Sequence, residues 1–446
     1  MTKDRTGSIP VAVTLTGMGI AADPALRAAR TRSVEEHVAA VLAGALPTRV
    51  ERVPLDDALG LVLGEDVASL VDLPGFDNSA MDGYAVRLAD VAAVVPGGPV
   101  VLPVSDDVAA GDGRVVVLAP GTAVRIMTGA PVPAGTDVVV PFEDTDRGTA
   151  TVAIGAVPPA GRHIRPRGED VTTGATVLTA GTVVGPVQVG LLAACGHTHV
   201  PVHRAPRVVV LSTGSELVPP GRPLAPGQIH DSNRPMLVAA ARALGALVTT
   251  APAIPDVPGA LAAAVREHLD GADVVITSAG VSAGAYDVVR EDLVTLVDDP
   301  ADVQLVHVAM QPGKPQGLAW VGERRVPVLG LPGNPVSAYV SFHLFARPLL
   351  RLLAGHATLS APVVGARLTQ AVSHKAGRRA YLRVRLTAGP DAWLATPVGA
   401  NSSHLLGALA HADALLVVPE DVTHMEAGSS ERVVVTEPDA LEWRVP

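Results

Sequence analysis

The sequence has little cysteine and few aromatic residues, and positive charge is in deficit. Cys195 is the single cysteine among 446 residues, so no disulfide can form within the chain and a cytoplasmic location is expected. Aromatic residues make up 2% of the chain, and the formal net charge is −10. A surface that stacks bases and follows phosphates needs the opposite of both, so no nucleic-acid partner is expected.

Long hydrophobic runs are absent as well. Glycine, proline or a charged residue interrupts every apolar stretch before it reaches about 18 residues, the length that indicates a membrane span. No membrane association is therefore expected. The first residues contain only a short apolar run broken by threonine and glycine, which is not typical of a secretory signal. Hydrophobic residues nevertheless make up 48% of the sequence, enough for several cores, and the length favours roughly three domains.

Lysine is scarce, because only three of the 34 basic residues are lysine: Lys3, Lys314 and Lys375. Lys314 stands between two prolines in the loop MQPGKPQG (310–317). An exposed lysine usually has no special role, but the arginine bias and the rigid loop favour a functional one here. A compact ammonium is suited to bind phosphate or a small oxyanion as a point charge.

The sequence pattern divides the chain into several domains. Short valine-rich strands with glycine and proline turns occupy residues 88–160 and are typical of a small β domain. From Arg207, strand-length runs such as VVVLS (208–212) alternate with runs of helical spacing, which predicts βαβ units and a parallel sheet. We therefore expect a multidomain α/β plus β fold, with a central parallel α/β domain flanked by small, mainly β domains. The predicted divisions are a tail (1–33), a linker domain (34–87 with 161–206), a small β domain (88–160), the α/β domain (207–355) and a C-terminal β domain (360–446).

Two helices are predicted outside the α/β domain. Ser33 and Glu36 form a capping-box pattern ahead of a run with helical spacing. The run PVQVGLLAACG (186–196) predicts a second, short helix. Its Cys195 is expected to be a small core residue rather than a nucleophile.

Small and polar residues follow the predicted strands of the α/β domain. In a parallel sheet, ligands bind beyond the carboxyl ends of the strands, where loops lead into helix N-termini that favour anions. One glycine-rich turn is weak evidence, since tight-turn geometry explains it equally well, but three in one sheet indicate a site. None contains the Gly-Lys-Ser/Thr of a Walker A loop. The segments are TGSELV (213–218) with HDSN (230–233), AGVSAGAYD (279–287) and PGNPVSA (332–338).

Two further polar segments lie outside the α/β domain. PGFDNSAMDGYAVR (74–87) contains Asp77, Asn78 and Asp82; the first two are equally consistent with a simple Asx-turn. GRHIRPRGED (161–170) gathers three arginines beside two carboxylates, a composition that a solvated charged loop would also explain.

Seven segments, taken in order, resemble the molybdopterin molybdenumtransferase family, to which the C-terminal domain of gephyrin also belongs. The resemblance covers about residues 33–435. It implies an elongated homodimer of four-domain subunits, dimerisation through the linker domain, and an α/β domain that binds the molybdopterin nucleotide. It also implies insertion of molybdate into the dithiolene of adenylylated molybdopterin, with Mg²⁺ and release of AMP. The segments are PGFDNSAMDGYAVR, RIMTGAPVPAG, GRHIRPRGED, LSTGSELV with GQIHDSN, AGVSAGAYD, PGKP and GLPGNPVSAY.

The resemblance also implies roles for individual residues. Mg²⁺ on a pyrophosphate group is held by one or two carboxylates and water, and the expected ligands are Asp256, Asp287 and Glu216. The expected catalytic residues are Asp82, Thr128, Asp170, Glu216, Asp287 and Lys314. The expected substrate-binding residues are Ser215, Asp231, Asn233, Gly280, Ser282, Gly284, Pro312, Gly313, Asn334, Ser337, Arg383 and Ser403.

The chain departs from the family pattern around Lys314. Gln311 stands where the family often has lysine, and His307 and Ala285 replace residues that are frequently charged. These replacements reduce the charge around the loop. They bear on how strongly molybdate is held and leave the reaction class unchanged.

Two other functions fit parts of the sequence. Stand-alone proteins that resemble only the α/β domain carry out the preceding adenylylation, but the long additions on both sides of that domain argue against this step. A gephyrin-like scaffold would need a long linker and an additional domain, which nothing in the sequence resembles. Besides the substrates and a second copy of the chain, the expected partners are the adenylyltransferase of the pathway and acceptor apo-molybdoenzymes.

Overall fold

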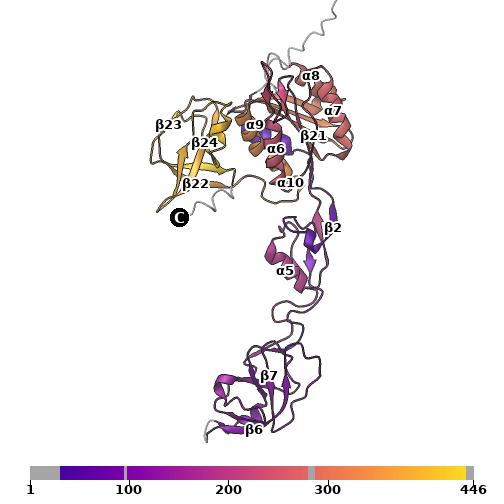
Figure 1. Ribbon diagram of the computed structural model, residues 1–446, viewed down its shortest axis with the longest axis vertical. Coiled ribbons are helices and arrows are strands. Elements are labelled where there is room, and N and C mark those ends of the chain that lie inside the picture. Colours follow the sequence, from indigo (N-terminus) through magenta and orange to yellow (C-terminus); the bar gives the residue numbers. More distant parts are fainter. Residues whose placement is uncertain (1–30, 95–97, 280–286, 438–446) are drawn as a thin grey trace, which may run out of the picture.

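The computed structural model describes residues 31–94, 98–279 and 287–437, and the chain is drawn out along one axis. The α/β domain lies at one end beside the C-terminal β domain, and a narrow stalk leads from it to a distal β domain at the other end (Figure 1). The expected fold class, multidomain α/β plus β, is confirmed. Among the described residues, no helix combines the length and the apolar character needed to cross a membrane.

The α/β domain is built on a seven-stranded sheet with helices on both faces. Side chains alternate along each strand, so Val208 and Val210 pack with the helices of one face, whereas Val209 and Leu211 pack with those of the other. The first face is covered by α2 (Val34–Leu42), α6 (Asn233–Arg242), α9 (Pro335–Ser341) and α10 (Arg347–Leu353), and the second by α7 (Ala260–His268) and α8 (Asp287–Thr295). The strands, in spatial order, are β1 (Thr31–Arg32), β18 (Val303–Val308), β20 (Pro315–Val321), β21 (Val326–Pro332), β17 (Val274–Ala279), β13 (Arg207–Ser212) and β16 (Leu247–Thr250).

The sheet is mixed, which corrects the prediction of a wholly parallel one. Strands β16, β13, β17 and β21 are parallel, but β20 pairs antiparallel with both β21 and β18. The reason is local: only the four residues 322–325 join β20 to β21, and so short a connection can only form a hairpin. Thr31 and Arg32, which the sequence pattern assigns to the tail, add β1 to the edge of this sheet.

Both of these predicted helices are present, but α2 packs on the α/β sheet rather than in the linker domain to which the sequence pattern assigns it. Helix α2 begins after Ser33 with the predicted capping box: the Ser33 hydroxyl accepts from the Glu36 backbone N–H at 3.0 Å, and the Glu36 carboxylate accepts from the Ser33 N–H at 2.9 Å. Helix α5 (Pro186–Ala194) follows Gly185 in the stalk. Cys195 at its end is fully buried, in agreement with a packing role.

The stalk and the distal domain are formed by two passages of the chain. In the stalk, β2 (Val50–Pro54) runs outward and pairs antiparallel with the returning β12 (His199–His203). The distal domain contains a five-stranded sheet around a small core of its own. Its strands, in spatial order, are β8 (Val138–Pro141), β5 (Gly83–Val86), β7 (Ala123–Ile126), β6 (Val100–Val108) and β9 (Thr151–Ile154).

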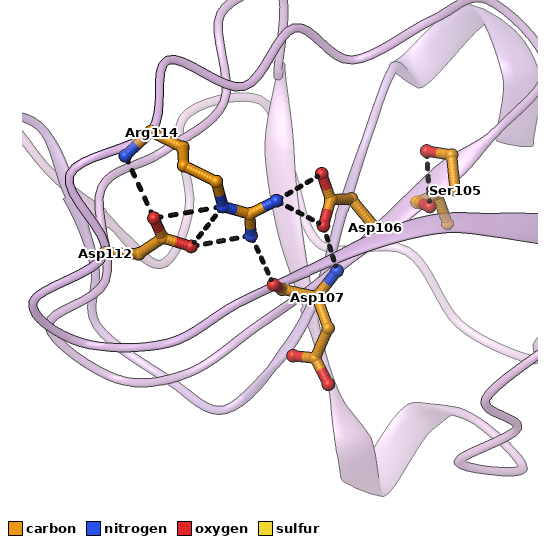
Figure 2. A network of polar contacts seen from close by, with 6 residues as sticks. Ser105, Asp106, Asp107, Asp112 and Arg114 are labelled. Atoms are coloured by element: carbon orange, nitrogen blue, oxygen red, sulfur yellow. Dashed lines mark hydrogen bonds and ion pairs between the residues drawn. The ribbon is translucent and has the colours of Figure 1, made fainter.

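An arginine fork holds the loop that follows β6. Figure 2 shows the Arg114 guanidinium between Asp112, at 2.6 Å, and Asp106, at 3.2 Å, and it also donates to the Asp107 carbonyl at 3.0 Å. The hydrogen bonds that the Arg114 side chain and backbone N–H donate to Asp112 lower the pKa of Asp112. Single surface ion pairs contribute little, so the role of this network is to fix the path of the loop.

The C-terminal domain is a six-stranded β sheet that packs beside α9. Its strand β24 (Arg379–Ala388) pairs parallel with β19 (Met310–Gln311), which belongs to the Lys314 loop. The Tyr339 hydroxyl of α9 donates to Glu437 at 2.7 Å. The other strands of this sheet are β22 (Val363–Leu368), β25 (Trp393–Pro397), β26 (Ala414–Val418) and β28 (Ser430–Val435).

A buried histidine lies in the π-helical segment Phe342–Ala346 that joins α9 to α10. His343 is 5% exposed, and neither ring nitrogen has a hydrogen-bond partner among the described residues. Its ring lies 4.4 Å from that of Tyr339 and 5.5 Å from that of Phe342. Burial, followed by the charge of Arg347, lowers the pKa of His343 to about 3.

Acid is expected to destabilise the fold through His343. The folded state keeps the imidazole neutral, whereas the unfolded chain takes up a proton near the usual pKa of 6.5. The free energy of unfolding is therefore unaffected by His343 above that pH and decreases as pH falls from about 6.5 toward 3. At pH 5 the loss amounts to about 2 kcal/mol. Denaturant unfolding of the wild type and His343→Gln at pH 7 and pH 5 measures it. The variant should lose less stability by that amount, and equal losses in both proteins would contradict the assignment.

Candidate functional site

Thr213 and Asn233 together tie the carboxyl ends of β13, β17 and β21; Asn233 is the first residue of α6. Its Nδ2 donates to the Ser278 hydroxyl at 2.7 Å and to the Gly333 carbonyl at 2.6 Å. Thr213, which follows β13, donates its backbone N–H to the Ser278 carbonyl at 3.2 Å. The loops after three neighbouring strands therefore meet at one edge of the sheet, where a ligand of a doubly wound fold binds.

Two acceptors at this edge are buried and unused. Asn233 Oδ1 and Thr213 Oγ1 have no hydrogen-bond partner among the described residues. Buried polar atoms are nearly always paired, so unpaired ones mark either strain or a missing ligand. Asn233 Oδ1 and Thr213 Oγ1 are therefore available to a polar group of a ligand that enters from beyond the sheet.

Asp231 lies nearby, but its carboxylate is used within the protein. It is 1% exposed and accepts from the Ser212 hydroxyl at 2.5 Å. It also accepts from the Arg234 backbone N–H at 3.2 Å and forms an ion pair with the Arg234 guanidinium at 3.2 Å. Both carboxylate oxygens of Asp231 therefore have partners within the protein, and these contacts hold the start of α6; its expected role in substrate binding stays a prediction.

Carboxylates line the loops on the outer side of the same edge. Ser215 and Asp256 exchange two hydrogen bonds, each of 3.0 Å, between the backbone N–H of one and the side chain of the other. Glu216 is exposed, and its carboxylate lies so close to Gly214 that a Cβ there would be 2.7 Å from it. Asp287 begins α8, but its side chain lies outside the described part of the chain, as do Gly280, Ser282 and Gly284.

These carboxylates are suited to Mg²⁺, which prefers oxygen ligands. The Asp256 Oδ2 atom accepts from Ser215, whereas no interaction of Oδ1 or of the Glu216 carboxylate with another described residue is present. No three metal-ligating side chains form a cluster among the described residues. The side chain of Asp287, the third expected ligand, lies outside the described part of the chain and is therefore not included in that statement.

The Lys314 loop presents an exposed ammonium on a tightly packed base. Gly313 has a φ of 103°, and a Cβ there would lie 2.9 Å from the Met310 and Ser341 side chains, so only glycine fits. Below it, Gln316 is 2% exposed and donates to the Gly313 carbonyl at 2.6 Å. Lys314 is exposed, and no carboxylate pairs with it in the described structure. Desolvation, followed by the Lys314 charge, lowers the pKa of the neighbouring His307.

The C-terminal domain contributes a turn that reaches the start of α9. The Val336 N–H donates to the Ser403 carbonyl at 3.0 Å. Arg383 is 5% exposed and donates to the Ser402 carbonyl at 3.1 Å and to the Ala400 carbonyl. Arg383 thus holds the turn that carries Ser403 beside α9, whose first residues follow Asn334 and include the buried Ser337.

Asp82 and Thr128 form a hydrogen-bonded pair on the distal domain. The Asp82 Oδ1 atom accepts from both the backbone N–H and the hydroxyl of Thr128 at 2.7 Å. These two bonds lower the pKa of Asp82, so its carboxylate stays ionised at neutral pH. Both residues are exposed, and the pair presents a fixed negative charge at the ends of β5 and β7.

The loop that carries Asp170 is held by Asp72. The Asp72 carboxylate accepts from the Thr173 N–H at 2.6 Å and from its hydroxyl at 2.8 Å, and it pairs with Arg167. These contacts lower the pKa of Asp72 to about 2. Asp170 itself is exposed and donates its backbone N–H to the Leu73 carbonyl at 3.0 Å, and its carboxylate has no hydrogen bond or ion pair with another described residue.

The structure brings the expected residues together in two separate groups. Ser215, Asn233, Lys314, Ser337 and Ser403 lie around the α/β domain and its junction with the C-terminal domain. Asp82 and Thr128 lie with β7 on the distal domain, separated from this group by the whole length of the stalk (Figure 1).

Two residues at the sheet edge are not predicted individually as site residues, although Thr213 lies within the predicted segment TGSELV (213–218). Thr213 directly follows β13, Ser278 is the last residue but one of β17, and a backbone hydrogen bond joins the two. A hydroxyl close to the end of a buried strand is the only signal for them in the sequence, and such a hydroxyl is also common in ordinary helix caps.

Models of protein families match three consecutive parts of the chain. Residues 32–196 match the MoeA N-terminal region (domain I and II). Residues 209–352 match a probable molybdopterin binding domain, and residues 365–435 match the MoeA C-terminal region (domain IV).

Whole proteins match over almost the same extent. The chain is 46% identical to molybdopterin molybdenumtransferase 2 of Mycobacterium tuberculosis over 90% of this chain and 99% of that protein. It is 39% identical to molybdopterin molybdenumtransferase 1 of the same organism, over 89% and 97% of the two chains. The crystal structure of a molybdopterin biosynthesis MoeA protein from Pyrococcus horikosii superposes with a TM-score of 0.79 at 32% identity, covering 92% of this chain and all of the other.

Proposed function

The chain belongs to the MoeA family of molybdopterin molybdenumtransferases, and from this premise we propose that it inserts molybdate into adenylylated molybdopterin with release of AMP. The observation that carries the proposal is the edge of the α/β sheet, where Asn233 links the ends of β17 and β21, Thr213 links the end of β13 to β17, and two buried acceptors are unused. This edge is where a nucleotide-bearing substrate binds in folds of this type.

The residues at this edge of the α/β sheet would bind different parts of an anionic substrate. Asn233 and Thr213 offer acceptors to the polar groups of the substrate. Lys314 offers a compact positive charge to molybdate, because its ammonium is exposed and the loop beneath it is fixed by Gly313 and Gln316. Although the chain is acidic overall, the local field decides where an anion binds.

Glu216, Asp256 and Asp287 are the residues that would hold Mg²⁺. The ion would supply charge stabilisation at the phosphate oxygens when AMP leaves. The Ser215 backbone N–H donates to Asp256 Oδ2, and the Asp256 backbone N–H donates to the Ser215 hydroxyl, so this ligand is oriented before a metal binds.

We propose that a working site needs two copies of the chain. Asp82 and Thr128 form a fixed, ionised pair that lies far from the α/β sheet of the same chain. In a two-fold dimer the distal domain of one subunit can reach the sheet of the other, and symmetry then gives two equivalent composite sites. The elongated shape of the chain supports this arrangement.

Release of AMP is the direct test of the proposed reaction. Purified protein with adenylylated molybdopterin should release AMP much faster with molybdate than without it. Consumption of ATP with free molybdopterin would instead indicate the preceding adenylylation step. Binding of a receptor segment without any turnover would indicate a scaffold, and either of these results would overturn the proposal.

Replacing Lys314 should impair the use of molybdate more than the binding of adenylylated molybdopterin. Loss of one charge-assisted contact costs about 1.5–3 kcal/mol, which is about 10–150-fold in apparent affinity. Lys314→Ala should therefore raise the molybdate concentration needed for half-maximal AMP release by that factor. Lys375→Ala, an exposed lysine in the C-terminal domain, is the matched control and should behave as the wild type. An equal loss of affinity for the adenylylated pterin would mean that Lys314 binds phosphate instead.

The proposed partners follow from this activity. They are the substrates, a second copy of the chain, the adenylyltransferase that supplies the adenylylated pterin and the acceptor apo-molybdoenzymes. The single cysteine supports a reducing, cytoplasmic location.

A further inference from the structure

A polar cavity lies where the stalk joins the α/β domain. It has a volume of about 430 Å³, which is within the usual range for small-molecule sites. One wall is formed by residues 44–49, the segment that leads from α2 into the stalk, and by Arg204, where the chain returns. The opposite wall belongs to the α/β domain and includes Arg207, Asp273 and Trp320. Both connections between the two domains therefore pass along this cavity.

The cavity faces away from the candidate active site. The parallel strands β13, β17 and β21 begin beside it, at Arg207, Val274 and Val326. The candidate active site lies at the other ends of the same strands. The sheet separates the two, so a ligand in the cavity would occupy a site of its own.

Positive charge is concentrated on the cavity walls of this otherwise acidic chain. Five arginines and a single carboxylate, Asp273, line it; the arginines are Arg49, Arg204, Arg207, Arg324 and Arg325.

Two of these arginines have acidic partners nearby, outside the cavity lining. Arg49 pairs with Glu51 at 2.6 Å, and Arg325 pairs with Asp302 at 2.8 Å. This leaves three arginines facing one carboxylate.

The remaining charges are fixed in place but not balanced. Asp273 accepts from the Arg204 guanidinium at 2.8 Å and from the Arg207 backbone N–H at 2.7 Å, whereas the Arg207 guanidinium is 3.7 Å away. Burial raises the pKa of Asp273, but the contacts with Arg204 and Arg207 outweigh it, so the carboxylate stays ionised. Arg324 donates only to the Leu269 carbonyl among the described residues. One acid thus serves two arginines, and the third has none.

We propose that this cavity binds a small polyphosphate anion that braces the joint between the stalk and the α/β domain. Arginine forks match phosphate oxygens in pairs. Here they come from both sides of the joint, Arg204 from the stalk side and Arg207 and Arg324 from the α/β domain. An anion with several phosphoryl groups satisfies arginines on both walls at once, whereas a single small anion engages fewer of them. The site is independent of the proposed transferase reaction.

Calorimetric titration with inorganic tripolyphosphate at low ionic strength tests the proposal on the full-length protein. The wild type should show one saturable site, and the double variant Arg207→Gln with Arg324→Gln should bind at least about tenfold more weakly, because each lost charge-assisted bond is worth that much. Inorganic sulfate, with one anionic centre, should bind more weakly than tripolyphosphate. Equal AMP release by the wild type and the double variant without the anion would show that the variant is folded.

Two matched variants locate the binding. Arg432→Gln removes an exposed arginine of the C-terminal domain and should leave the affinity unchanged. Lys314→Ala should also leave it unchanged, since that residue belongs to the other edge of the sheet. Absence of saturable binding, equal weakening in the Arg432 variant, or weakening by the Lys314 variant alone would each overturn the proposal. The last result would mean that the probe binds at the candidate active site.

Discussion

Mixed dimers of Asp82→Ala and Asp287→Ala chains are expected to recover about half of the wild-type AMP release, although each variant alone is inactive. Asp82 belongs to the distal domain and Asp287 to the start of α8 in the α/β domain. If each site combines the distal domain of one chain with the sheet of the other, one site of the mixed dimer collects both lesions and the second site is intact. If each site lies within one chain, every site carries a lesion and the mixed dimer is inactive.

Co-expression with two different affinity tags isolates the mixed dimers. A mixture of Asp82→Ala with Thr128→Ala is the control, because Asp82 and Thr128 lie in the same pair. Each shared site of that dimer carries one lesion, so its activity should stay absent. If mixed dimers of Asp82→Ala and Asp287→Ala are folded and contain both tags but are inactive, this result would contradict the shared site. Recovery in the control would reveal contaminating wild-type chains.

The sequence predicts best the elements that rest on local patterns. The capping box places the start of α2, and the strand-length valine run places β13, which extends from Arg207 to Ser212. These signals depend only on neighbouring residues and on the side-chain period. The antiparallel direction of β20, in contrast, does not follow from such a local pattern. It is decided by the charged turn 322–325, whose residues read equally well as a solvated loop.

The contacts that assemble the candidate site are long-range and are not predictable in detail. Asn233 is predicted from the segment HDSN that carries the family resemblance, but its bonds to Ser278 and Gly333 join residues 45 and 100 positions away. Asp231 stands only two residues before Asn233, yet its carboxylate is buried and used internally. Whether a polar side chain faces a ligand or a helix end is decided by the tertiary packing, which a pattern of residue types does not contain.

The elongated shape is likewise a property of the tertiary structure that the residue pattern does not contain. Motif order suggests a common function for Asp82 and the α/β residues, but one chain keeps them apart along the stalk. The arginines at the joint between the stalk and the α/β domain are the opposite case, because the fold brings together residues that the sequence does not connect. Arg49, Arg204 and Arg324 are far apart in sequence and carry no motif, and only the fold brings them to one cavity.

Replacing Asp256 or Asp287 with asparagine is expected to reduce AMP release by about a hundredfold or more, because a metal at the phosphate contributes several kcal/mol to transition-state stabilisation. The asparagine side chain keeps the shape of the carboxylate and an oxygen atom but removes the charge that Mg²⁺ requires. In Asp256→Asn the backbone N–H at position 256 can still donate to Ser215 Oγ, so the loop should keep its fold.

The dependence on Mg²⁺ separates metal binding from a structural effect. AMP release is measured over a range of Mg²⁺ concentrations, and Mg²⁺ affinity is measured by calorimetry on the same samples. Both variants should need more Mg²⁺ or fail to respond to it, while their dimer content and thermal unfolding match those of the wild type. Asp270→Asn removes an exposed carboxylate of the α/β domain that follows α7 and should change neither quantity. Unchanged turnover of both site variants at saturating Mg²⁺ would remove Asp256 and Asp287 from the metal site and leave Glu216 as the remaining expected ligand.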